Sequence, residues 1–179
     1  MIARTFLPRL LLILALAFGL VLPAQAQFDV LPEVRAGVMM HDAGLFDPAN
    51  IRDANVELLF SIPALETVVG EVRPHIGATV NFDGKESLVY SGLSLTFRVP
   101  VLPVFVEAGL GGALHDESFD ANKTRFGCAA LAQAQASVGV GILPGVSLIG
   151  TVQHATDFGM CGTPNNGLTT AGLRLGIRF

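Results

Sequence analysis

AQAQASVGV, residues 132–140, decides the fold. Small or aliphatic side chains occupy every second position of this stretch, and two glutamines and a serine fall between them. Because successive side chains of a strand point to opposite faces, this alternation predicts a strand with one apolar and one polar face. The stretch is also long enough for a β-strand that crosses a membrane.

Seven further segments show the same alternation, and their charged residues fall on the polar face. A charge on the lipid face at the centre of a membrane costs roughly 2–4 kcal/mol, so the polar face is the inner face of a barrel. After residue 26, no uncharged apolar run is long and unbroken enough for a membrane-spanning helix. Because backbone groups in lipid must all be paired, we predict an all-β fold, an eight-stranded antiparallel transmembrane β-barrel. The seven segments are residues 33–41, 55–60, 72–81, 93–98, 104–110, 146–153 and 173–179.

The interior of such a barrel is just wide enough for side chains to fill it. We therefore expect the inward charges to pair with one another in an ionic plug, which disfavours a channel. Ile149 departs from the pattern, because it puts an apolar residue on the polar face of residues 146–153. The charges expected in the plug are Glu33, Arg35, Glu57, Arg73, Glu107, Arg174 and Arg178.

An export signal precedes the strands. Arg4 and Arg9 come before the apolar run of residues 10–22, and the small residues at 24–26 form a cleavage site. We therefore predict a signal peptide over residues 1–26.

The remaining part, residues 27–179, is predicted to be one barrel domain in the bacterial outer membrane. Phe179 ends an alternating apolar strand, a pattern typical of chains that the outer-membrane assembly machinery inserts. The formal charge of −4 becomes −6 without the two arginines of the signal peptide. Such an acidic chain is a poor binder of nucleic acid.

Two cysteines fall on the outer side of the predicted barrel. With both termini in the periplasm, Cys128 lies at the outer end of its strand and Cys161 in the last outer loop, residues 157–167. In an exported chain this placement favours one disulfide over two unpaired thiols. Metal binding by two cysteines alone is less favoured. The segment His115-Asp116-Glu117 has cation ligands, but we expect a solvated loop there and predict no metal site.

His154 and Thr156 continue the lipid-facing side of residues 146–153, at the outer end of that strand. Side chains two positions apart on a strand point the same way, so the imidazole is placed to activate the hydroxyl as a nucleophile. On this pattern alone, a solvated pair at the membrane interface is the alternative.

The last third of the chain resembles a known family. Residues 154–168, HATDFGMCGTPNNGL, and residues 172–179, GLRLGIRF, are similar to the signature of the lipid A 3-O-deacylase (PagL) family, whose members are often called acyloxyacyl hydrolases. The family pattern is H-x-S-N-A, then N-P-G, then G-x-R-x-G-Y-x-F, and residues 105–113 are similar to its fifth strand. The resemblance implies an eight-stranded outer-membrane barrel with an active site that faces lipid at the outer rim. It implies no cofactor.

By this resemblance, His154 is the catalytic histidine and Thr156 the nucleophile, and Asn165 and Gly167 match the N-x-G element. The implied reaction removes the 3-linked hydroxyacyl chain of lipid A, free or within lipopolysaccharide. Backbone amides near Gly159 are then expected to bind the oxyanion.

Three positions depart from the family pattern. Thr156 replaces a serine, Asp157 replaces an asparagine, and Thr169 falls near the place expected for an acid that orients the histidine. A non-catalytic barrel of the same descent, with a structural, adhesive or lipopolysaccharide-binding role, is therefore the alternative to an ester hydrolase.

Overall fold

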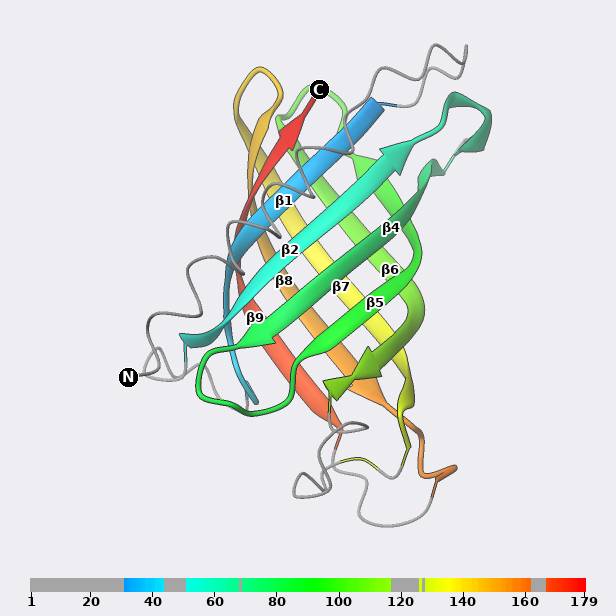
Figure 1. Ribbon diagram of the computed structural model, residues 1–179. Coiled ribbons are helices and arrows are strands. Elements are labelled where there is room, and N and C mark those ends of the chain that lie inside the picture. Colours follow the sequence, from blue (N-terminus) through cyan, green and yellow to red (C-terminus); the bar gives the residue numbers. More distant parts are fainter. Residues whose placement is uncertain (1–30, 44–50, 68, 117–125, 127, 162–166) are drawn as a thin grey trace, which may run out of the picture.

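The described strands form one antiparallel sheet that is closed on itself (Figure 1). The computed structural model describes residues 31–43, 51–67, 69–116, 126, 128–161 and 167–179. The pairing of β1 with β9 and of β2 with β4 closes the sheet. In the described residues the strands are β1 (Leu31–Met40), β2 (Ile51–Ser61), β3 (Glu66–Thr67), β4 (Gly70–Asn81), β5 (Leu88–Arg98), β6 (Val104–His115), β7 (Ala130–Leu143), β8 (Val146–Thr156) and β9 (Leu168–Arg178).

The predicted eight-stranded antiparallel barrel is confirmed, and each of the eight predicted segments coincides with one long strand, except that His41 and Phe179 lie one residue beyond the ends of β1 and β9. The two-residue strand β3, which extends the sheet beside β4, is an addition that the sequence did not indicate. In the described part of the chain, no helix has the length and apolar character needed to span a membrane. The predicted signal peptide lies outside the described residues.

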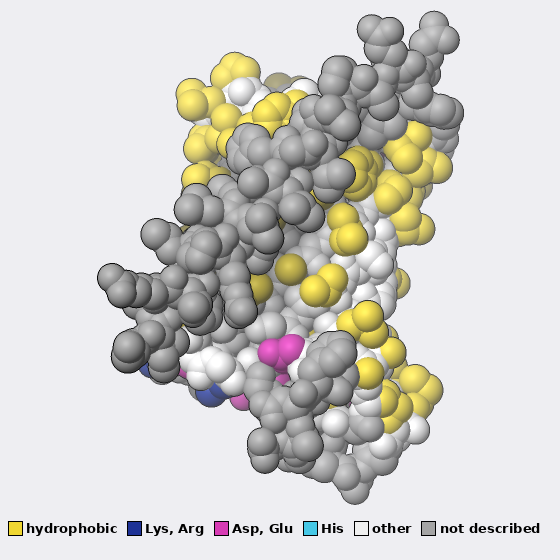
Figure 2. All heavy atoms as spheres, in the orientation of Figure 1, with side chains coloured by type: hydrophobic (Ala, Val, Ile, Leu, Met, Phe, Trp, Pro, Cys, Tyr) yellow, Lys and Arg dark blue, Asp and Glu magenta, His cyan; other side chains and the backbone are white. Residues whose placement is uncertain are grey.

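The outer wall of the barrel is apolar, as the alternation predicted. Exposed valine, leucine and isoleucine side chains alternate with inward residues along the long strands, and Leu110 is 72% exposed. Figure 2 shows such side chains distributed over this wall. Because no other described element lies over these positions, they form the surface that contacts lipid acyl chains.

The predicted ionic plug fills the half of the interior that the predicted topology places toward the periplasm. Arg35 is fully buried and binds Glu107 with two hydrogen bonds of 2.6 and 3.0 Å and Glu33 with one of 2.7 Å. Arg73 donates to the second oxygen of Glu33 over 2.6 Å, and the Arg174 guanidinium lies 3.0 Å from a Glu57 oxygen. Paired guanidinium and carboxylate groups therefore occupy the space that a channel would need.

The Ile149 side chain points into the barrel, as its position on β8 requires, and is fully buried. Glycines make room for it, because a Cβ added at Gly176 would lie 3.0 Å from the Ile149 side chain. Gly139, the β7 partner of Ile149, likewise leaves space for the Phe105 ring, 2.2 Å from where its Cβ would be. The apolar residue therefore does not break the alternation of β8, and the assignment of faces on this strand holds.

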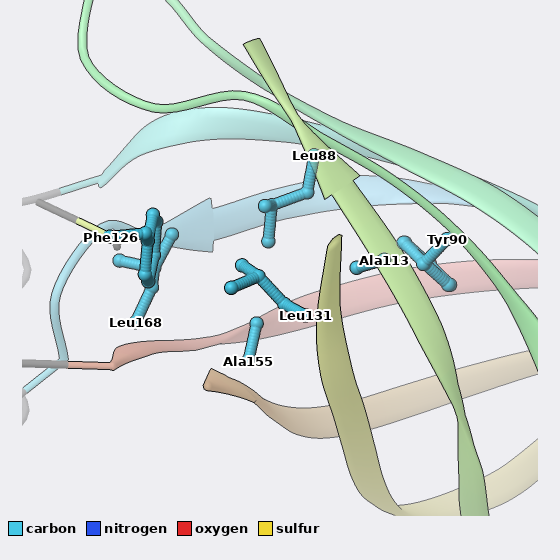
Figure 3. Close-up of a cluster of buried hydrophobic side chains, with 7 residues drawn as sticks. All are labelled: Leu88, Tyr90, Ala113, Phe126, Leu131, Ala155 and Leu168. Atoms are coloured by element: carbon cyan, nitrogen blue, oxygen red, sulfur yellow. The ribbon is translucent and has the colours of Figure 1, made fainter. Parts of the chain in front are cut away.

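The outer half of the interior is closed by an apolar cluster, at the lower end of the barrel in Figure 1. Its seven members come from five strands and from Phe126, and their inward side chains are buried against one another (Figure 3). The cluster consists of Leu88, Tyr90, Ala113, Phe126, Leu131, Ala155 and Leu168.

A buried histidine joins two connections at the same end. The Nδ1 atom of His41 lies 3.0 Å from an Asp53 oxygen, and its Nε2 atom lies 3.1 Å from a Glu86 oxygen. Burial alone would lower the pKa of His41, but the hydrogen bonds and charges of Asp53 and Glu86 outweigh it and raise this pKa above the usual 6.5. Asn81 also donates to Asp53, over 2.7 Å.

We expect this histidine to make the stability of the barrel depend on pH. Since the folded-state pKa is raised, the contribution of His41 is complete below pH 6.5 and is lost as the pH rises through the raised value. The melting temperature of the wild type should therefore decrease as the pH rises from about 6.5 to 8, the range in which histidine titrates. His41→Gln should melt lower and show a flatter curve, and parallel curves for the two proteins would contradict this role.

Candidate functional site

The two predicted site residues lie on the outer wall at the end of β8. His154 is exposed and pairs across the sheet with Ala134 of β7 and Thr169 of β9. Thr156, the last residue of β8, is half-buried and pairs with Ala132. Both side chains thus point toward lipid from the same strand and the same rim, as the alternation predicted.

The imidazole of His154 is held between two parts of the segment that begins β9. Its Nδ1 atom is 2.9 Å from Thr169 Oγ1. On the other side, a Cβ added at Gly167 would lie 2.8 Å from His154 Cε1 and 3.1 Å from Nε2. Gly167 also has a φ of +53°, in the region that favours glycine. Only glycine can therefore follow this path against the imidazole.

The Thr156 hydroxyl is oriented by the turn that follows it. Its oxygen accepts a hydrogen bond of 3.1 Å from the backbone N–H of Phe158. Within the described residues, no hydrogen bond links the His154 imidazole directly to this hydroxyl. Hydrogen bonds between a nucleophile and its base are often long in the absence of substrate and tighten when substrate binds.

Asp157 is turned into the barrel and is 1% exposed. Its carboxylate accepts hydrogen bonds from the backbone N–H groups of Gly159, over 2.9 Å, and Cys161, over 3.3 Å. Asp157 therefore fixes the turn from inside and does not contact the outer wall. The Gly159 amide, which we expected to bind an oxyanion, is already committed to this carboxylate.

The predicted disulfide is confirmed. Cys128 and Cys161 are bonded, with their Cα atoms 5.6 Å apart, and no described cysteine is free. The bond ties the turn after Thr156 to the start of β7. Asp157 lies close to both sulfurs, but bonded cysteines are not thiolate ligands, so this group does not form a metal site.

The prediction of a solvated loop at 115–117 is wrong for His115, which ends β6 and is 4% exposed. Its Nε2 atom lies 2.6 Å from the Cys128 carbonyl oxygen, and its ring packs against Phe126. Asp116 accepts the Ser87 N–H over 2.9 Å. Apolar packing and backbone hydrogen bonds therefore hold these two residues. Glu117 and Asn165 lie outside the described residues.

An apolar groove of about 570 Å³ runs along the outer wall on the membrane side of His154. Small residues and larger aliphatic side chains of neighbouring strands line it. The sequence pattern gave no signal of this groove, because its shape depends on which small residues the strand register places side by side. Its lining includes Met40, Ala136, Val138, Gly150, Val152, Ala171 and Leu173.

A family model described as lipid A 3-O-deacylase (PagL) matches residues 70–178, which is more than half of the chain and includes both site residues. The chain belongs to the PagL family. As a member of this family of outer-membrane barrels, it is a protein of the bacterial outer membrane.

Solved structures share the β-barrel fold of this chain. The outer membrane enzyme PagL is 18% identical, with a TM-score of 0.56 over 81% of this chain and 98% of that one. The N-terminal β-barrel domain of Pseudomonas aeruginosa OprF is 13% identical, with a TM-score of 0.50 over 83% of this chain and 97% of that one. A de novo designed transmembrane β-barrel is 11% identical, with a TM-score of 0.51 over 83% of this chain and 95% of that one. No curated protein matches the chain.

Proposed function

We propose that this PagL-family protein is an ester hydrolase that removes the 3-linked hydroxyacyl chain of lipid A or lipopolysaccharide in the outer leaflet. The observation that carries the proposal is the lipid-facing pair at the rim, in which Thr169 holds the Nδ1 atom of His154 and Thr156 lies two positions further on the same face. The other ring nitrogen of His154, Nε2, is the one that would transfer the proton.

The reaction follows from these two groups. Thr156 Oγ1 attacks the ester carbonyl carbon, and His154 Nε2 accepts the hydroxyl proton. The bond between that carbon and the sugar 3-oxygen breaks, and the oxygen leaves with the proton from His154. Water then attacks the acyl-threonine ester, with the same histidine as base, and releases the 3-hydroxy fatty acid.

The apolar groove supports an acyl substrate. Its residues Val152 and Gly150 follow His154 toward the membrane centre on the same face of β8. A chain attached to an ester near Thr156 would lie along this groove without leaving the apolar phase.

Mass spectrometry of lipid A tests the proposal. Gram-negative cells that express the full chain should contain lipid A that lacks one 3-hydroxyacyl group, in comparison with cells that carry an empty vector. The purified barrel should give the same product from lipid A in detergent. Unchanged lipid A in both assays, with a folded barrel present, would overturn the proposed function.

A non-catalytic, lipopolysaccharide-binding barrel is the second candidate. It is favoured by one observation: the imidazole Nδ1 contacts the hydroxyl of Thr169 and not a carboxylate. Retention of lipopolysaccharide by the purified barrel, without change in its acyl chains, is the result expected for this candidate.

Gly167→Ala is expected to lower deacylation on the order of a hundredfold, because the new methyl group would displace the imidazole and misplaced catalytic groups cost about that much. Initial rates on purified lipid A measure this effect. Gly159→Ala is the matched control. It adds the same methyl group at a φ of +72°, but with no atom within 4 Å, so it should cost stability and little activity. Equal activity losses in the two variants would contradict the role of Gly167.

A further inference from the structure

Thr169 lies directly opposite His154 in the β8–β9 register, on the outer wall. Its hydroxyl oxygen is 2.9 Å from the imidazole Nδ1 atom. Either group can donate in a hydrogen bond between a hydroxyl and an imidazole nitrogen, so the contact alone leaves two tautomers of His154. The tautomer determines whether His154 can act as the base, because only an unprotonated Nε2 can take a proton from the nucleophile.

The position of Thr169 is fixed from three directions. Its backbone carbonyl accepts a hydrogen bond of 2.8 Å from the Ala43 N–H, beyond the end of β1. Leu168 on one side is 1% exposed in the apolar cluster, and Thr170 on the other side is 2% exposed and faces the interior. Threonine is also stiff at χ1, because its Cβ carries two heavy atoms. The hydroxyl is therefore a rigid partner.

We propose that Thr169 is the positioning residue of the site, and that its hydroxyl accepts the Nδ1–H of His154 and so keeps Nε2 free as the base. This inference rests on the proposed function and names what orients its histidine. The orienting group is neutral: it fixes the tautomer and the ring plane, but it does not balance the charge of the imidazolium that forms during the reaction.

In the described part of the chain, no charged side chain faces His154 to compensate the positive charge of the imidazolium. The residues that face His154 from the flanking strands are Ala134 and Thr169, and its neighbours on the same face of β8 are Val152 and Thr156. An acid introduced at 169 would favour the imidazolium, so it should shift the acidic limb of the pH–rate profile to higher pH.

Three variants of the full-length barrel test the inference. Thr169→Val removes the hydroxyl with little change of shape and should lower kcat at least about tenfold, a part of the roughly 10²–10⁴-fold that a positioned general base contributes. KM should change little. Thr169→Ser should restore kcat, and Thr169→Glu should raise it and shift the acidic limb. Ser91→Val, which removes a lipid-facing hydroxyl on β5, is the control and should act like the wild type.

Nitrogen-15 NMR of the histidine ring supplies a reading that does not depend on turnover. The wild type should show His154 protonated at Nδ1, and Thr169→Val should lose this preference. A wild type protonated at Nε2, or unchanged kcat in Thr169→Val, would overturn the inference even with an active enzyme. An inactive wild type protonated at Nδ1 would refute the proposed function and would leave Thr169 as the residue that sets the tautomer.

Discussion

His154→Ala and Thr156→Ala should each remove nearly all deacylation while leaving the barrel folded. A nucleophile and its base act as a unit, so the loss of either one removes most of the catalytic gain, on the order of 10³-fold or more, and the double variant should be no worse than the single ones. Neither side chain is buried in the interior, so truncation leaves no cavity there. Thr156→Ala also loses one hydrogen bond from Phe158, which costs about 1 kcal/mol.

The measurement is the rate of fatty-acid release from lipid A, with heat-modifiable mobility as the check of folding. Thr156→Ser should retain or raise activity, since a primary hydroxyl is less hindered. Val56→Ala, a truncation on the lipid face of β2, is the control and should keep the wild-type rate. Deacylation that survives in Thr156→Ala would show that the nucleophile is another group.

Arg35→Met is expected to destabilise the barrel by about 3–5 kcal/mol, because removal of one partner from a buried ionic network leaves its counterions without compensation. Arg35 is fully buried and contacts Glu33, Glu57 and Glu107. The measurement is the midpoint of urea unfolding in detergent. Arg52→Met is the matched control: the Arg52 side chain is 47% exposed and pairs with Asp83 at the outer rim, so its loss should cost at most about 1 kcal/mol.

Should Arg35→Met fail to fold, a second variant keeps the argument testable. Arg35→Met with Glu107→Leu removes one charge of each sign from the network and should recover part of the stability. Equal stability of Arg35→Met and Arg52→Met would mean that the plug does not stabilise the fold.

The sequence predicted the strands best where the barrel interior is polar. Along residues 132–140 every inward position is polar or glycine, so the alternation is complete. At the outer end the interior is apolar, so inward and outward residues no longer differ in polarity there. Leu88 and Tyr90 face inward, and β5 therefore begins five residues before the predicted segment. The same apolar lining explains why the inward His115 was expected in a solvated loop.

The site could be predicted only as far as one strand contains it. Strand parity placed His154 and Thr156 on the same outward face, and the inward direction of Asp157 follows from the same rule. The contacts of the imidazole with Gly167 and Thr169 depend instead on the path of the chain into β9. A period-two pattern contains no information about that path.

The outward direction of the pair determines how a substrate reaches it. The interior is sealed by the ionic plug and the apolar cluster, so encounter takes place by lateral diffusion within the leaflet. The quantity that sets the encounter rate is then the mole fraction of lipid A in the surface around the barrel, not its bulk concentration. Under the proposed function, added detergent or phospholipid should therefore dilute that surface and slow turnover at constant total substrate.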